Sequence, residues 1–280
     1  MKLISFQDID FKQSDIISIA LGNFDGIHIG HKKVLKTALK YGKKRAALLT
    51  FNQSPKSFFE KSEFKPLLSF SQKCKILEKM GFYALIVIDF SDDFSRMSGE
   101  EFVNRLLRIS SLRYLIAGAD FQCGHNRATN IETIKAILKN QLVTLKTVPI
   151  DCKGACKVSS TLIRELVLSG QFRDVKALTG RDYILELPTC NAMPVVIGST
   201  YQWQFHYNHL NQLFPKHGIF KVTSKRNYGM ISVSNNSVIL TLKKGFLPPF
   251  VRIGNQIYKG DLYYDHIRSK KANRKRFWHK

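Results

Sequence analysis

Two histidines three positions apart, His28 and His31, lie in a glycine-rich segment that directly follows an apolar run. Imidazoles donate hydrogen bonds to phosphate oxygens and, when protonated, offset the charge that develops during phosphoryl or nucleotidyl transfer. Residues 16–21 are short, β-branched and uncharged, which predicts a buried parallel strand, and apolar residues at helical spacing from Gly30 predict a helix. The histidines are therefore expected at a helix N-terminus, where backbone N–H groups and the helix dipole favour anions.

The segment around the histidines permits tight turns and a close approach of backbone to a ligand. It reads Gly22-Asn23-Phe24-Asp25-Gly26-Ile27-His28-Ile29-Gly30-His31. Two alternatives stay open for an isolated H-x-x-H pattern: two loop histidines on a turn, or half of a metal site. The position between a predicted strand and a predicted helix favours the phosphate site.

The chain has 280 residues, of which 44% are hydrophobic, and this is enough for one large or two modest domains. No apolar stretch approaches the roughly 20 residues that span a bilayer, and the first ten residues lack the apolar region of a signal peptide. A cytoplasmic protein is expected. The cysteines lack zinc-site spacing, so no metal site is predicted and reduced thiols are expected at Cys74, Cys123, Cys152, Cys156 and Cys190.

The formal net charge of +23 is high for this length. It indicates either a nucleic-acid partner or a general lysine bias of the genome. Residues 268–280 hold seven lysines and arginines and no acid. Such a tail is typical of a solvated terminus, and a contact with RNA or a membrane is the alternative.

Strand and helix signals alternate along the first two thirds of the chain. Further strands are expected at residues 45–51, 83–88, 112–117 and 142–148. Helices are expected at residues 72–80, 98–107 and 129–138, the last two opened by capping boxes at Ser98 and Thr129. Repeated β-then-α units predict an α/β fold with a parallel sheet and helices on both faces. Ligands of such sheets bind beyond the carboxyl ends of the strands.

Two further segments combine suitable chemistry with such a position. Residues 118–124 follow the fourth predicted strand and offer a carboxylate and an aromatic face, which suits a flat ring with a polar edge. The alternative there is a turn with an Asx bend. Residues 158–164 place three hydroxyl residues at the start of a helix with Arg164 one turn inside it, which suits a phosphate cradle. An ordinary N-cap needs only one hydroxyl.

After Gly180 the helical patterns stop and short alternating runs appear, separated by turn residues. They lie at residues 219–222, 229–233, 237–242 and 256–258. Such runs predict a small all-β domain. The expected organisation is an α/β domain over residues 1–183 and an all-β domain over residues 184–280.

Three motifs in this order resemble those of the bacterial FAD synthetase family, the bifunctional riboflavin kinases and FMN adenylyltransferases. Residues 22–31 are similar to its G-N-F-D-G-V-H-x-G-H motif, residues 118–121 to its G-x-D-F flavin loop, and residues 159–164 to its S-S-T-x-I-R segment. The resemblance covers residues 16 to about 183 well and the remainder weakly. It implies a Rossmann-like nucleotidyltransferase domain followed by a flavokinase-like β barrel.

On this resemblance, the first domain would transfer AMP from ATP to the phosphate of FMN, forming FAD and releasing pyrophosphate. His28, His31 and Arg164 would be its catalytic residues at the ATP phosphates, with Mg²⁺ bridging those phosphates. Asp120 and Phe121 would bind the flavin. The full set expected to bind the substrates is Gly22, Asn23, Phe24, Asp25, Gly30, Gly118, Asp120, Phe121, Ser159, Ser160 and Thr161.

The chain departs from the family pattern in both domains. The family's T-F-x-P-H-P segment reads T-F-N-Q-S-P here, so Ser54 replaces a histidine that would contact substrate phosphate. In the second domain, Thr189 and Asn191 resemble a kinase motif for Mg²⁺-ATP, but the glycine-rich stretch between the domains is missing. No glutamate or aspartate lies between Lys221 and Asp261. Without a carboxylate base, phosphorylation of riboflavin is expected to be slower by about 10²–10⁴.

Two alternative functions remain at this stage. One is the full bifunctional enzyme, which also phosphorylates riboflavin to FMN. The other is a basic RNA-binding protein that uses a nucleotidyltransferase-like domain as its scaffold, with residues 268–280 as the contact. The sequence predicts no oligomeric state.

Overall fold

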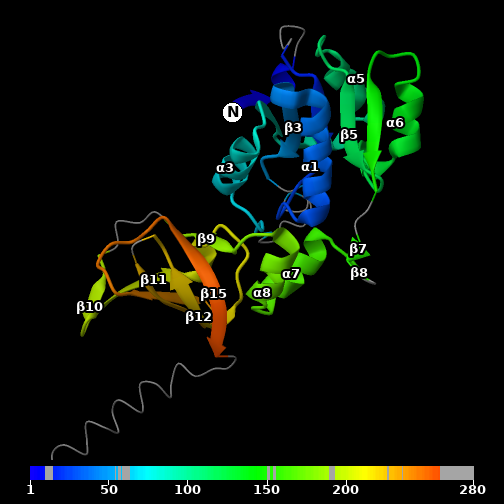
Figure 1. The fold of residues 1–280 in the computed structure, drawn as a ribbon. Helices are drawn as coiled ribbons and strands as arrows, with labels where there is room; N and C mark the ends of the chain where they lie inside the picture. Colours follow the sequence, from blue (N-terminus) through cyan, green and yellow to red (C-terminus); the bar gives the residue numbers. More distant parts are fainter. Residues whose placement is uncertain are drawn as a thin grey trace, which may run out of the picture. The chain divides into compact units, whose positions relative to one another are not determined.

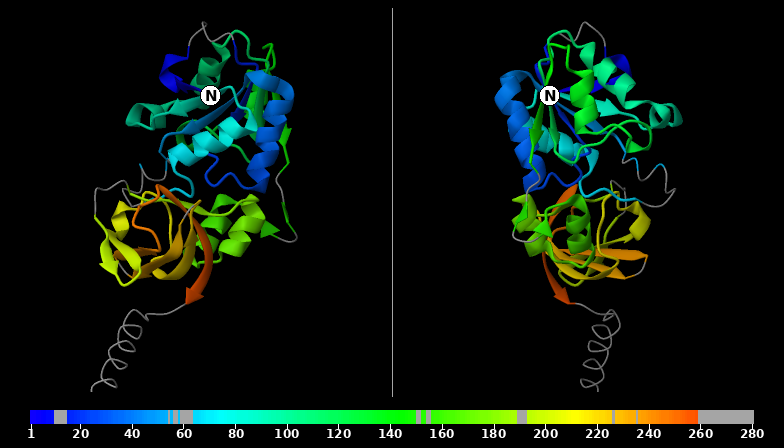
Figure 2. Two further views of the ribbon diagram at one scale, coloured as in Figure 1. Left: turned by 60° about the vertical axis from the view of Figure 1, so that its left-hand side comes forward. Right: turned by 90° about the vertical axis from the view of Figure 1, so that its right-hand side faces the viewer.

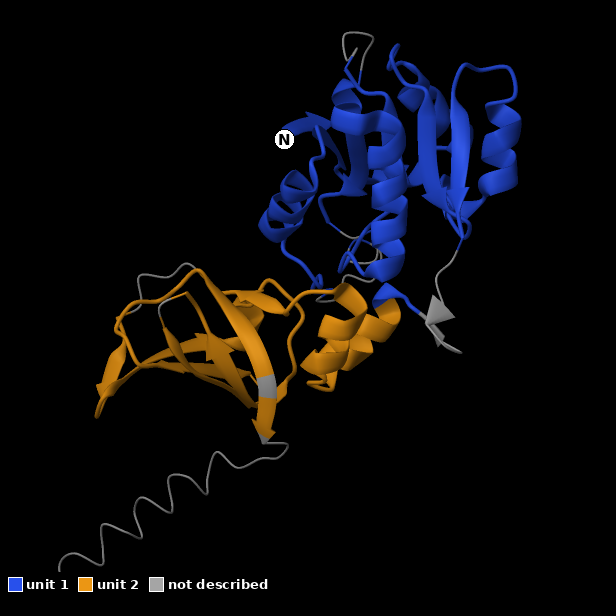
Figure 3. Cartoon of the chain, in the orientation of Figure 1, with its two compact units in different colours: residues 1–160 blue, residues 161–280 orange. Residues whose placement is uncertain are grey.

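The computed structural model describes residues 1–9, 15–53, 55, 58, 64–149, 152–153, 156–188, 193–225, 227–234 and 236–258. The chain divides into two compact units, Met1–Ser160 and Thr161–Lys280 (Figure 3). The predictions made for Ser54, Thr189, Asn191 and the basic tail 268–280 lie outside the described residues.

The first unit is coloured from blue to green in Figure 1. It is built on a parallel sheet of six strands, in the order β1-β4-β3-β2-β5-β6. Every neighbouring pair is parallel, which confirms the predicted α/β class. Strand β1 is missing from the sequence-based prediction, because it is a four-residue edge strand without an apolar run. The strands are β1 (Lys2–Ser5), β2 (Ser18–Leu21), β3 (Ala46–Phe51), β4 (Ala84–Ile88), β5 (Tyr114–Gly118) and β6 (Thr144–Val148).

Helices cover both faces of this sheet, as two further views show (Figure 2). One face is covered by α1 (Ile29–Gly42) and α3 (Phe70–Met80), and the other by α5 (Gly99–Leu107) and α6 (Ile131–Ile137). Short elements complete the unit: η1 (Phe6–Asp8), η2 (Lys43–Arg45), α4 (Asp92–Arg96) and η3 (His125–Arg127).

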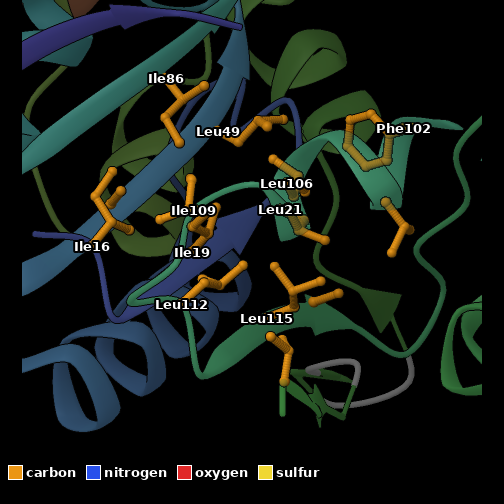
Figure 4. Packing of buried hydrophobic residues seen from close by; sticks show 14 of the residues in the cluster. Ile16, Ile19, Leu21, Leu49, Ile86, Phe102, Leu106, Ile109, Leu112 and Leu115 are labelled. Carbon is orange, nitrogen blue, oxygen red and sulfur yellow. The ribbon is translucent and has the colours of Figure 1, made fainter. Parts of the chain in front are cut away.

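Strand β3 contributes side chains to the hydrophobic cores on both faces of the sheet. Ala46 and Leu48 belong to the core cluster that contains α1 and α3, whereas Ala47 and Leu49 belong to the cluster that contains α5 and α6. Successive side chains of a strand point to opposite faces, so an uninterrupted apolar run is what a doubly covered strand requires. Figure 4 shows the second cluster, in which Leu49 lies among residues of α5 and the neighbouring strands.

One of the two predicted capping boxes is confirmed. Ser98 accepts from the Glu101 N–H, and the Glu101 carboxylate accepts from the Ser98 N–H. The box predicted at Thr129 is wrong, because Asn130 is the N-cap of α6 and its Oδ1 accepts from the Thr133 N–H at 3.0 Å. Thr129 is instead buried in a β-bridge with Cys123. Asparagine caps a helix at least as well as threonine does. Thr129 is buried one position before the N-cap and does not cap the helix.

Strands β2 and β5 are neighbours although two strands separate them along the chain. From β2 the chain moves to β3 and β4 on one side, and it then crosses to β5 on the other side. The edge at which such a sheet reverses its strand order is where ligands bind, outside the carboxyl ends of the strands. The segments that follow β2 and β5 begin at Gly22 and Ala119. Two of the three predicted motifs therefore follow the strands that form this switch point.

The second unit contains an antiparallel sheet of seven strands, in the order β10-β11-β14-β13-β12-β15-β9. This confirms the predicted all-β fold, although β9, β10 and β11 have no counterpart in the predicted runs. Its strands are β9 (Ile184–Glu186), β10 (Val195–Ile197), β11 (Thr200–His206), β12 (His217–Thr223), β13 (Tyr228–Ser234), β14 (Ser237–Leu242) and β15 (Phe250–Tyr258), with η4 (Tyr207–His209) after β11. The helices α7 (Ser160–Leu168) and α8 (Phe172–Thr179) precede β9, whereas a small hairpin, β7 (Cys152–Lys153) and β8 (Cys156–Lys157), belongs to the first unit.

Helix α8 packs with the β strands through an aromatic cluster. The Phe172 ring lies 5.3 Å from the ring of Tyr183, 5.9 Å from Phe214 and 5.5 Å from Phe220, measured between centroids. The domain boundary after residue 183 stays a prediction. The aromatic cluster is the physical reason that the compact unit already includes helix α8.

We expect Phe172→Ala to lower the free energy of unfolding of the second unit by about 3–5 kcal/mol, because truncation of a buried aromatic side chain leaves a cavity. Both tryptophans of the chain, Trp203 and Trp278, belong to this unit, so tryptophan fluorescence during urea denaturation reports on it. Phe246, whose side chain is 45% exposed, provides the matched control Phe246→Ala. Equal stability of the two variants would contradict the packing role of α8.

Candidate active site

The loop between β2 and α1, residues 22–28, is here called the histidine loop. It turns sharply: Gly26 has a φ of 83°, and a Cβ there would lie 2.9 Å from Leu67 Cδ1. Phe24 and Ile27 also have positive φ values, 51° and 37°, although neither is a glycine. Both side chains are fully buried. Such backbone conformations persist only where surrounding contacts over-determine them.

The two histidines lie at the N-terminus of α1, where the sequence predicts them. His28 is the N-cap residue, and its Nδ1 accepts from the His31 N–H at 3.3 Å. The imidazole rings of His28 and His31 stack with their centroids 3.6 Å apart, and the edge of Phe24 packs on His31. Because Nδ1 of His28 is an acceptor in this bond, Nε2 is its donor nitrogen. Gly30 is the second residue of the helix.

Asp25 joins the histidine loop to two other segments. Its side chain is buried, and Oδ1 accepts from the Leu67 N–H at 2.8 Å. Its backbone carbonyl accepts from the Ser160 hydroxyl, also at 2.8 Å. Of the predicted hydroxyl motif, Ser160 therefore lies against the histidine loop, and Ser159 is half-buried beside it in the chain. Thr161 and Arg164 belong to the second compact unit, and their role at the phosphates stays a prediction.

A buried lysine that the sequence reasoning missed contacts the same loop. Lys73, in the first turn of α3, donates to the Asn23 carbonyl and to Thr50 Oγ1, both at 3.1 Å. Thr50 Oγ1 in turn donates to the Asn23 carbonyl at 2.8 Å. Burial lowers the pKa of Lys73 to about 8, and the charge of Asp25 acts in the opposite direction. A charged residue on the apolar stripe Phe70-Lys73-Leu77 was the available signal.

A small, partly open pocket lies beside this lysine. Its polar lining comes from Asn23, Asp25, Asn52 and Lys73, and its apolar lining includes Phe51. Two of the predicted binding residues, Asn23 and Asp25, thus line a pocket at the carboxyl ends of β2 and β3. Apolar walls with a few convergent polar groups are typical of small-molecule sites.

The predicted flavin segment follows β5 in a tight turn, with the Phe121 N–H donating to the Gly118 carbonyl at 3.0 Å. A Cβ at Gly118 would lie 3.1 Å from the Asp120 carboxylate. Asp120 is exposed, whereas Phe121 is half-buried and packs against the core. The carboxylate is therefore the accessible group of this turn, and its role in flavin binding stays a prediction.

Two cysteines of the first unit, Cys74 and Cys123, lack the character of a nucleophile. Cys74 and Cys123 are free, and burial raises the pKa of both, that of Cys123 to about 11. Within the described part of the chain, no group of three or more metal-ligating side chains is found. None of the helices described there is long and apolar enough to cross a membrane.

Lys73 should make the stability of the protein depend on pH. Its pKa is about 8 in the folded state against an ordinary value of 10.5, so the unfolded state binds more protons between these values. Stability therefore rises as pH increases through this range. The free energy of unfolding of Lys73→Met lacks this rise with pH. Relative to the wild type, the variant should therefore become less stable by about 1–3 kcal/mol between these pH values. Urea denaturation of both proteins below pH 8 and near pH 10.5 measures this change; a constant difference would contradict it.

The comparisons with known proteins concentrate on the unit that carries this site. Residues 11–162 match the family model described as FAD synthetase. A bifunctional riboflavin kinase/FMN adenylyltransferase from Buchnera aphidicola is 32% identical over 174 residues, which are 59% of this chain and 55% of that protein. A FAD synthetase from Listeria monocytogenes is 27% identical over 178 residues, which are 62% of this chain and 72% of that protein. The chain thus spans about half the length of the Buchnera relative.

A solved structure resembles the whole chain. The crystal structure of a macrolide-efflux protein from Streptococcus pneumoniae matches with a TM-score of 0.73 at 23% identity, and the match covers 99% of this chain and 100% of that one. At this identity the likeness shows the fold alone. The family match covers more than half of the sequence and includes the histidine loop, β5 and Ser160. The chain belongs to the FAD synthetase family.

Proposed function

We propose that this chain is an FMN adenylyltransferase, which transfers AMP from ATP to FMN and releases pyrophosphate. The observation that carries the proposal is the stacked pair His28 and His31 at the N-terminus of α1, beyond the carboxyl end of β2. Backbone N–H groups, the helix dipole and two imidazoles converge there, and a polyphosphate is the ligand that this combination favours. Membership of the FAD synthetase family supports FMN as the acceptor.

The reaction needs no covalent enzyme intermediate. An oxygen of the FMN phosphate attacks the α-phosphorus of ATP, a new P–O bond forms, and the bond from the α-phosphorus to the β-bridging oxygen breaks to release pyrophosphate. The protein then contributes positioning and charge stabilisation. His28 donates from Nε2 to a phosphate oxygen while Nδ1 caps the helix, and His31 acts beside it.

The remaining substrate contacts follow from the positions of the other motifs. Ser160 lies at the histidine loop, so we assign it to the phosphates together with Ser159. Asp120 and Phe121 follow β5, the other strand of the switch point, and we assign them to the flavin. Mg²⁺ enters as part of the Mg²⁺-ATP substrate, held by phosphate oxygens and water.

For the second unit we propose a flavokinase-like module with little or no kinase activity. Strands β13 to β15 and the end of β12 lie between Lys221 and Asp261. That stretch contains no aspartate or glutamate. The alternative is the bifunctional enzyme, which the name of the Buchnera relative favours. The RNA-binding alternative rests on the tail 268–280, outside the described residues.

The proposal is tested by incubating the purified protein with FMN and Mg²⁺-ATP and measuring FAD by chromatography and pyrophosphate by a coupled assay. FAD and pyrophosphate should form in equal amounts. If neither product forms while FMN and ATP are both intact, the proposed activity is wrong. Retention of RNA that disappears when residues 268–280 are deleted, without flavin binding, would favour the RNA-binding alternative instead.

A further inference from the structure

Lys73 lies where a lysine is unfavourable on three counts. Its side chain is only 7% exposed, although an ammonium group is costly to bury. It stands in the first turn of α3, where the helix dipole favours acidic residues. It also interrupts the apolar stripe by which α3 packs on the sheet. A methionine or leucine would satisfy all three requirements better, so packing does not explain the lysine.

The ammonium group of Lys73 completes a junction between three segments of the first unit. It donates to the Asn23 carbonyl in the histidine loop and to Thr50 Oγ1 at the end of β3, both at 3.1 Å. Thr50 also donates to the same Asn23 carbonyl at 2.8 Å. One loop carbonyl therefore accepts two hydrogen bonds, one of them from a cation. Charge-assisted bonds of this kind are roughly twice as strong as neutral ones.

The junction acts on the part of the loop whose backbone is strained. Asn23 is followed by Phe24, which has a φ of 51°, and four residues after Phe24 the loop ends at the N-cap His28. A non-glycine residue at positive φ costs about 1–3 kcal/mol and needs external contacts to hold it. Lys73 and Thr50 supply such contacts at the residue next to Phe24, and Asp25 adds a second anchor through the Leu67 N–H.

We propose that Lys73 is a positioning residue for adenylyl transfer: its contact with the Asn23 carbonyl holds the histidine loop in the conformation that presents His28 and His31 to the ATP phosphates. This inference rests on the proposed function. Lys73 need not touch a substrate, because it acts through the backbone of the loop. A displacement of reacting groups by about 1 Å is enough to slow an enzyme by about 10²-fold.

The cost of burying the Lys73 ammonium group distinguishes a positioning role from a stabilising role. The pKa of Lys73 is lowered to about 8, mainly by burial, so the folded protein carries a cost for this ammonium group at neutral pH. Removing the group relieves that cost. A positioning role therefore predicts a variant that folds at least as well as the wild type and turns over more slowly.

The test compares Lys73→Met with Lys79→Met, which makes the same chemical change at an exposed position of the same helix. For Lys73→Met we expect kcat for FAD formation to fall between about tenfold and 100-fold, with KM for FMN within threefold of the wild-type value and an unfolding midpoint no lower than that of Lys79→Met. Lys79→Met should keep wild-type kinetics. Equal kcat for both variants, or a loss of kcat matched by a loss of stability, would overturn the inference.

A double-mutant cycle with Thr50→Val tests the route through the junction. If Lys73 acts through Asn23 and Thr50, the double variant Lys73→Met/Thr50→Val should lose less kcat than the product of the two single fold-losses. In the control double variant Lys79→Met/Thr50→Val, the fold-loss should equal the product of the single fold-losses. Independent combination in both pairs would contradict the route. Hydrogen exchange of the amides of residues 23–28 gives a readout without catalysis: Lys73→Met should lower their protection. A wild-type protein that forms no FAD contradicts the proposed function, whereas unchanged protection contradicts only the role of Lys73.

Discussion

Replacing His28 by alanine should lower kcat for FAD formation by about 10²–10³, because the proposed function uses this side chain as a preorganised donor to the charge of the transition state. The same change removes the N-cap of α1, whose acceptor is Nδ1 of His28. Loss of a cap costs about 0.5–2 kcal/mol of stability. The alanine variant alone therefore mixes two effects. Steady-state kinetics and thermal unfolding must be measured on the same preparation.

The variant His28→Asn separates the two effects. Asparagine is among the strongest N-caps, so its side-chain oxygen should accept from the His31 N–H and preserve stability. It lacks the Nε2 donor, so kcat should fall as far as in His28→Ala. His31→Ala should lower kcat by a factor of the same order. It should leave the cap intact, because only the backbone N–H of His31 takes part in it. Wild-type kcat in His28→Asn would show that the histidine is needed only to start the helix.

With riboflavin as the sole flavin, FMN should form far more slowly than FAD forms from FMN, since a kinase without its general base is slower by about 10²–10⁴ than one that has it. Strand β14 pairs along its whole length with residues 229–234 of β13, and neither strand carries an acidic side chain. These strands therefore offer no carboxylate that would take the proton of a riboflavin hydroxyl.

The control for this prediction is the same enzyme sample supplied with FMN, which shows that the protein is folded and active. Chromatography separates riboflavin, FMN and FAD in a single run. If FMN accumulates from riboflavin at a rate comparable with FAD formation, the bifunctional alternative is correct. The base would then have to come from outside the stretch between Lys221 and Asp261.

Local patterns predicted most of the first unit. Residues 16–21 and 46–51 are uncharged and mostly apolar because the sheet is covered on both faces, and this pattern located β2 and β3. Strand β1 carries no such run, because it lies at the edge of the sheet. Helix α8 is missing from the sequence-based prediction, although its buried residues Phe172, Val175 and Thr179 have helical spacing. Its packing partners Phe214 and Phe220 lie more than 40 residues further along the chain, and only the structure identifies them.

The site divides in the same way. The cap by His28 and the stacking with His31 follow from residues three positions apart, so a motif indicated where they lie. In the junction, Lys73 lies 50 positions from Asn23 along the chain and 23 positions from Thr50. A charged residue on an apolar helix stripe indicates that something unusual is buried, but only the structure identifies its partner as the histidine loop.

The most direct test of the central claim follows the phosphorus atoms of ATP. The protein is supplied with riboflavin and FMN together and with ATP labelled at either the α- or the γ-phosphorus, and the labelled products are separated by chromatography. We predict that α-label appears in FAD, that γ-label appears in pyrophosphate, and that FMN acquires almost none. Unlabelled FAD in the α-label reaction would contradict adenylyl transfer at His28 and His31, and γ-labelled FMN would contradict the inactive kinase unit.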